Sequence, residues 1–148
     1  TEAANYFGRL VNAGDSTFLA YRQPLANYID GLVALGGAYW DTMLSATSFV
    51  GVGIEGITVP LKDGMPAITN NNFVAGDLNQ LTGLKGNGST KYLDTGTKFN
   101  DAPQNDFSMS VNATETILEG SGGYYLVWQS FGDGILLHSM IKALTITT

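Results

Sequence analysis

Cysteine is absent from this sequence of 148 residues, and histidine occurs once, as His138. The chain therefore has no disulfide, no thiolate nucleophile and no cysteine-ligated metal, and one histidine cannot build a zinc site by itself. Basic residues are also scarce: seven Lys and Arg against thirteen Asp and Glu give a net charge of −6. Because the basic residues are scattered singly, no patch is expected to bind phosphate backbones, and nucleic acid is excluded as an expected partner.

Charge of either sign is low, since only 14% of the residues are charged. Long apolar runs are missing as well, because Asp30, Asp41, Glu55 and Asp133 interrupt them. A membrane-spanning helix needs about 20 consecutive apolar residues, so no membrane insertion is expected. A hydrophobic content of 44% nevertheless predicts a folded chain, and 19 glycines among many uncharged polar residues indicate either a surface of uncharged polar loops or one partly buried in an assembly.

The first third of the chain has helical spacing. Phe7, Leu10 and Val11 predict a short amphipathic helix over residues 1–13, with a loosely ordered arm as the alternative. Two further helices are predicted, one through residues 25–33 that stops at the glycine pair 36–37 and one over residues 38–46. Together these two predict a helical hairpin.

From Thr47 onward, glycine, threonine and β-branched residues replace the helical pattern. Strands are predicted at residues 57–62, 72–75, 78–84, 91–94, 107–113, 124–131 and 134–147. The predicted class is α+β: a helical region over residues 1–50 followed by a β-rich, sandwich-like region over residues 51–148. The two regions can also form one compact domain.

Two glycine motifs invite a nucleotide-binding interpretation. Gly51, Gly53 and Gly56 have the spacing of the dinucleotide fingerprint, but Pro60 follows in a β-like run where that motif requires a helix. Gly83 and Gly88 have the outer spacing of a phosphate loop, yet the lysine that should precede Ser89 is missing. Both sets are interpreted as turn glycines, and no cofactor is predicted.

Candidate catalytic or metal-binding groups are also weak. His138 is interpreted as an ordinary strand histidine, because no nucleophile and orienting carboxylate can be assigned to it. Calcium-binding loops around Asp77 and Asn79 remain an alternative, although Asp and Asn are also common turn residues, and no metal is predicted. A glycoside hydrolase would need paired carboxylates, for which Glu115 with Glu119 is one candidate.

Short motifs occur in a fixed order along the middle of the chain. They are GG at 36–37, YWD at 39–41, VPLK at 59–62, NFVAGD at 72–77, TGLKGNGSTKYLDTG at 82–96 and DAPQND at 101–106. This series, within residues 25–111, resembles a family of phage virion proteins described as tail-fibre or structural proteins. The resemblance implies a helical region followed by a partial antiparallel jelly-roll sandwich of the concanavalin or laminin-G type, and no enzymatic activity.

The resemblance also assigns a role to the glycine-rich block. Gly83, Gly86, Gly88 and Ser89 would form the turn that leads into the sandwich, with positive φ angles at Gly86 and Gly88. The strand after this turn would then place Leu93 in the core as its first anchor.

Self-assembly is the expected function, because fewer strands follow Gly83 than the about eight of a jelly roll, and bare strand edges pair readily. The preferred state is a homotrimer that joins other virion proteins, so the expected location is the virion, assembled in the host cytoplasm. Interface residues are predicted near the chain ends: Phe7, Leu10, Val11, Leu144 and Ile146.

A carbohydrate-binding module that recognises a host-surface glycan is the alternative function. Aromatic rings stack on sugars, and polar loops supply hydrogen bonds to their hydroxyl groups. The residues proposed for glycan contact are Tyr124, Trp128, Asp101 and Asp106.

Overall fold

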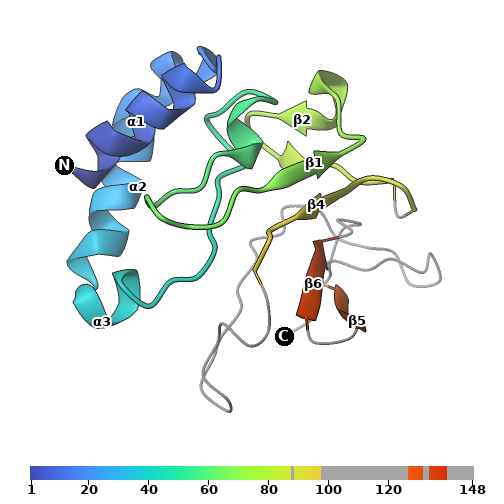
Figure 1. Cartoon of the computed structure of the whole chain (residues 1–148). Coiled ribbons are helices and arrows are strands. Elements are labelled where there is room, and N and C mark those ends of the chain that lie inside the picture. The colour runs from blue at the N-terminus through green and yellow to red at the C-terminus, as the bar shows by residue number, and fades with distance from the viewer. Residues whose placement is uncertain (88, 98–126, 132–133, 140–148) are drawn as a thin grey trace, which may run out of the picture.

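The computed structural model describes residues 1–87, 89–97, 127–131 and 134–139. Figure 1 shows the α-helices gathered on one side of the molecule and the strands on the other. The helices are α1 (Glu2–Asn12), the 3₁₀ helix η1 (Thr17–Tyr21), α2 (Arg22–Ala34), α3 (Gly37–Trp40) and the 3₁₀ helices η2 (Gly56–Thr58) and η3 (Ala75–Asp77). The strands are β1 (Thr69–Asn71), β2 (Leu78–Asn79), β3 (Gly83–Leu84), β4 (Tyr92–Asp94), β5 (Val127–Phe131) and β6 (Gly134–Ser139). The α+β class is confirmed.

α1 confirms the short amphipathic helix predicted at the N-terminal end. The Thr1 hydroxyl accepts a hydrogen bond from the Ala4 N–H at 3.3 Å and caps the first turn. Ala3, Tyr6, Phe7 and Leu10 form the buried face of this helix. The chain then turns at Gly14, which has a φ of 84°.

The predicted helical hairpin forms only in part, because α3 has four residues and ends at Trp40. The Lys62 ammonium donates to the carbonyl oxygens of Trp40 and Asp41 at 3.0 and 2.9 Å. It thereby satisfies carbonyl groups that a longer α3 would use for its own hydrogen bonds. The helix predicted over residues 38–46 is therefore much shorter than its sequence pattern indicates.

In the described part of the chain, one hydrophobic core runs from α1 to β4 and crosses the boundary at residues 50 and 51. Its buried members are Ala3, Tyr6, Phe7, Leu10, Phe18, Leu25, Ile29, Trp40, Val52, Ile57, Val59, Leu61, Ile68, Phe73, Leu84 and Leu93. The helices and the first strands thus share one core, rather than packing around separate ones.

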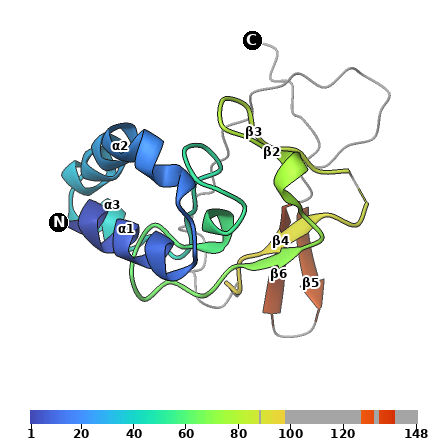
Figure 2. The same ribbon diagram turned by 90° about the horizontal axis from the view of Figure 1, so that it is seen from above.

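The described strands form two antiparallel sheets. The larger has the order β1-β4-β6-β5, with Leu93 of β4 opposite both Asn70 of β1 and Ser139 of β6. The smaller is the β2–β3 pair. Figure 2 shows the larger sheet beside the helices rather than beneath them. The strand predicted at residues 91–94 is confirmed as β4, and parts of those predicted at 124–131 and 134–147 appear as β5 and β6.

The strand predicted at residues 57–62 is wrong. Ile57, Val59 and Leu61 are all buried, which explains the alternating pattern, but their backbone lies in η2 and a loop. The Thr47 hydroxyl is 2.9 Å from the carbonyl oxygen of Ile57 and 3.3 Å from that of Val59, and the Leu61 N–H donates to Ala46 at 2.9 Å. Isolated hydrogen bonds therefore replace a strand ladder here.

Two other strand predictions are displaced. Asn72 has a φ of 67°, which ends β1 before the predicted strand at residues 72–75 can form. The strand predicted at residues 78–84 is divided into β2 and β3, because the Asn79 side chain accepts from the N–H groups of Leu81 and Thr82 at 2.8 and 3.1 Å. The strand predicted at residues 107–113 lies outside the described residues.

Asp15 joins the helices to the loop at residues 51–56. Its side chain is buried at 3% exposure, and its two carboxylate oxygens accept the N–H of Thr17 and the N–H of Gly53, each at 2.7 Å. A β-carbon at Gly56 would collide with this carboxylate, and one at Gly53 would lie 3.1 Å from it. Glycine is therefore required where the loop meets Asp15, which gives the glycine spacing in this loop a structural reason.

Arg9 of α1 makes a second polar link, to the segment that follows η2. Its guanidinium donates to the carbonyl oxygens of Pro60 and Leu61 at 3.3 and 2.8 Å, and lies 5.8 Å from the centre of the Tyr6 ring. Burial raises the pKa of Tyr6 well above its usual value, and the charge of Asp15 raises it further, although Arg9 acts in the opposite direction. Tyr6 is therefore a neutral core residue at physiological pH.

We predict that Asp15→Ala destabilises the fold by about 1–3 kcal/mol, because it leaves two backbone N–H groups without their acceptor. Asp63→Ala, at an exposed aspartate, is the matched control and should change stability by no more than about 0.5 kcal/mol. Urea denaturation measures both. Equal stability of the two variants would show that Asp15 does not hold the loop at residues 51–56.

Candidate functional site

The described part of the chain has two candidate sites: the glycine-rich block at residues 83–96 and a groove between α1 and α2. The glycine-rich block is closed by Asn87. Its side-chain oxygen accepts the backbone N–H groups of Ser89, Thr90 and Lys91 at 3.1, 3.0 and 3.1 Å. The Asn72 amide donates to the Thr90 carbonyl at 2.8 Å and fastens the turn to the neighbouring loop. An asparagine side chain thus holds this turn.

The same block is tied to η3 by an ion pair. The Lys91 ammonium lies 2.5 and 2.6 Å from the two carboxylate oxygens of Asp77, which also accepts the Val74 N–H at 2.8 Å. The hydrogen bonds from Lys91 and from the Val74 backbone hold the pKa of Asp77 below its ordinary value of 3.8. Within the described residues, no group of three or more His, Asp or Glu side chains is placed to hold a metal ion.

The predicted roles within the block are partly corrected. Leu93 is 2% exposed, which confirms it as a core anchor. The positive φ angles of this stretch belong to Gly83 (83°) and Gly96 (65°), not to Gly86, and Gly88 lies outside the described residues. The side chain of Asn87 closes the turn, so a left-handed Gly86 is not needed.

The predicted N-terminal interface also needs correction. Phe7 and Leu10 are 7% and 0% exposed and pack in the chain's own core, so they offer no free apolar face. Val11, at 60% exposure, is available for contact. Leu144 and Ile146 lie outside the described residues.

The other candidate residues fall mainly outside the described part. Tyr124, Asp101, Asp106, Glu115 and Glu119 all lie there. Trp128 is on β5, where its backbone pairs with Leu137 of β6. His138 is a strand residue on β6, as predicted, and its backbone pairs with Val127 and Asp94. The glycan-contact residues stay a prediction.

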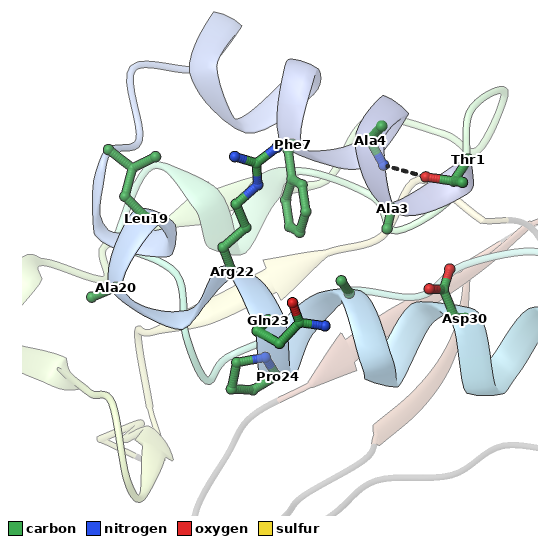
Figure 3. A pocket seen from close by; sticks show the side chains of 11 residues that line it. Thr1, Ala3, Ala4, Phe7, Leu19, Ala20, Arg22, Gln23, Pro24 and Asp30 are labelled. Carbon is green, nitrogen blue, oxygen red and sulfur yellow. Dashed lines mark hydrogen bonds between the residues drawn. The ribbon is translucent and has the colours of Figure 1, made fainter.

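A groove of about 600 Å³ lies between the first turns of α1 and the η1–α2 segment (Figure 3). It is lined by Thr1, Ala3, Ala4, Phe7, Leu19, Ala20, Arg22, Gln23, Pro24, Ala26 and Asp30. Most of the lining residues are small or apolar, but polar atoms make up the larger part of the exposed lining, and Arg22 and Asp30 are its charged side chains. The groove thus offers apolar contact surface together with one cationic and one anionic side chain.

One lining residue, Phe7, stacks on a buried aromatic ring and has a cation over its own ring. Phe7 stacks on Phe18 with ring centres 5.3 Å apart, and the Arg22 guanidinium lies 5.5 Å from the centre of the Phe7 ring. Figure 3 shows Arg22 between the helices, with Leu19 and Ala20 toward one end and Thr1, Ala4 and Asp30 toward the other. Sequence reasoning missed this site, although the spacing of Arg22, Ala26 and Asp30 on α2 would have indicated a shared helix face.

Comparison with protein-family models, with curated proteins and with solved structures gave no match for this chain. Among the helices that the structure describes, none has the length and apolar character to cross a membrane.

We predict a pH-dependent contribution from the Asp77–Lys91 pair. The pKa of Asp77 is lowered in the folded state, so its stabilising effect is present above the ordinary value of 3.8 and is lost as the pH falls below it. Asp77→Asn should therefore lower the urea midpoint at about pH 7 and much less at about pH 2. Asp63→Asn, at an exposed position, is the control. An Asp77→Asn effect of the same size at both pH values would contradict this role.

Proposed function

We propose that this chain is a non-enzymatic structural protein of a phage virion, a component of a tail fibre, a head fibre or a capsid-decorating layer. It acts by packing against copies of itself and against other virion proteins. In this proposal the strands belong to a partial jelly-roll sandwich whose edges another chain completes.

The edge of the larger sheet is the observation that carries the proposal. β5 has five residues and pairs with β6 on one side, while no other described strand lies on its second side. β1 is the opposite edge and pairs only with β4 among the described strands. The edge of a sheet is a template for a strand from another chain, and these two edges of the described sheet support the proposal of a homo-oligomer, preferably a trimer.

The use of the polar side chains gives further support. Asp15, Asp77 and Asn87 each accept backbone N–H groups of the chain itself, and Arg9 donates to its carbonyl groups. These groups stabilise loops, so they are not available as acids, bases or ligand donors. The ordered series of motifs from residue 36 to residue 106, which resembles phage virion proteins, supports the same function.

The proposed location is tested by mass spectrometry of gradient-purified phage particles from the bacterium that produces this chain. The chain should be present in the particles in amounts comparable to other structural proteins. Its absence from particles, when it is abundant in the lysate, would refute a virion role.

The proposed edge contact is tested with Gln129→Pro and Ser130→Pro on β5. Successive residues of an antiparallel edge strand direct their N–H groups alternately toward the neighbouring strand and away from it. Since proline lacks an N–H, one variant should damage pairing with β6, and the other should keep the fold but lose self-association. Thermal melting and sedimentation velocity separate the two effects. If the variant that keeps the fold self-associates as strongly as the unchanged chain, this edge is ruled out as the contact.

A further inference from the structure

The groove between α1 and α2 carries one cationic and one anionic side chain. If the groove of a second copy is turned by 180° and faces the first, the cation of each copy meets the anion of the other. Arg22, Ala26 and Asp30 all line it, and they lie four residues apart on α2. Residues at this spacing share one face of a helix, one turn above another. The face therefore carries a cation, a small residue and an anion in a row, with the small residue at the centre.

The two charges cannot pair within one chain. Eight residues of α-helix separate Arg22 from Asp30, which corresponds to about 12 Å along the axis. Neither residue belongs to an ion pair within the part of the chain that the structure describes. Arg22 is also placed at the first residue of α2, where the positive end of the helix dipole disfavours a cation. Both charges are thus available to an external partner.

The groove also has a large exposed side chain at one end and a small exposed one at the other. Leu19 is 62% exposed and stands at the end of the groove where α2 begins. The exposed Ala4 of α1 and Asp30 of α2 lie toward the opposite end, on the two helices that border the groove (Figure 3). A half-turn about the centre of the groove brings the large side chain of each copy to the small-residue end of the other. Ala26 at the centre allows the two helices to approach closely.

We propose that a second copy of this chain docks in this groove through a twofold contact in which the α2 helices run antiparallel. In a twofold interface each contact occurs twice, so Arg22 of each copy faces Asp30 of the other, and Leu19 of each copy packs on the other's exposed Ala4. This contact rests on the self-packing that the proposed function includes, and it assigns that packing to residues distant in sequence from the β5 edge.

Charge reversal tests the contact by sedimentation equilibrium, with each copy having a mass of 15.7 kDa. Arg22→Asp or Asp30→Arg alone should place like charges opposite one another and weaken dimerisation by about tenfold or more. The double variant R22D/D30R restores opposite charges and should dimerise like the unchanged chain. An equimolar mixture of the two single variants should form a mixed dimer, because each acidic face then meets a basic one.

Two controls separate this contact from changes in folding. Asp63→Arg makes the same charge change as Asp30→Arg at another exposed position and should leave dimerisation unchanged. Leu19→Ala should weaken dimerisation without changing the charge, and thermal melting verifies the fold of every variant.

The result is decided by the pattern of loss and rescue. A single-copy mass for the unchanged chain at high concentration would exclude a second copy as the occupant of the groove. The proposal would also be overturned if neither charge reversal weakened dimerisation, or if dimerisation did not return in the double variant and in the mixture. If self-association persists but responds only to the β5 proline variants, the edge-strand proposal stands and the groove proposal fails.

Discussion

The buried carboxylate of Asp15 is the constraint on which the arrangement of the described part depends. It stands at the end of α1, accepts the N–H of Thr17 at the start of η1, and accepts the N–H of Gly53 from the loop at residues 51–56. The Asp15 side chain therefore fixes the ends of α1 and η1 next to the loop at residues 51–56. Gln80 continues the connection, since its amide accepts from Gly51 at 2.8 Å and donates to Val52 at 2.6 Å. The β2–β3 hairpin is thereby linked to the helices.

The position of this loop determines what fills the core. Val52 and Ile57 are both fully buried, and they enter the core from a segment without strand pairing. Side chains supply hydrogen bonds to the backbone near these residues, among them the guanidinium of Arg9 and the hydroxyl of Thr47. Burial of this segment therefore leaves fewer backbone groups without partners. Polar side chains thus replace regular structure in the middle of the chain, which fits a sequence rich in Asn, Thr and Gly but low in charge.

Local patterns predicted the parts of the fold that local forces determine. The spacing of Phe7 and Leu10 predicted α1, and the short apolar signal before Asp94 predicted β4. The same spacing could not show what covers the apolar face of α1, which is why Phe7 and Leu10 were placed at an interface although they are core residues. Alternation at residues 57–62 was mistaken for a strand, because burial alone produces that pattern when side chains satisfy the backbone. The groove was missed because tertiary packing brings α1 and η1 together.

Assembly through strand edges and assembly through the α2 face would differ in what they specify. An edge strand supplies many equivalent backbone hydrogen bonds, which give affinity but define register weakly when the strand is short. The α2 face has a cation on one side of a small residue and an anion on the other. It adds less affinity, since exposed ion pairs are weak. It does discriminate strongly by orientation, because a parallel approach of two α2 helices would bring Arg22 to Arg22 and Asp30 to Asp30. The buried polar atoms hold loops of the chain itself. In the proposed contact, exposed charges such as Arg22 and Asp30 would orient the copies.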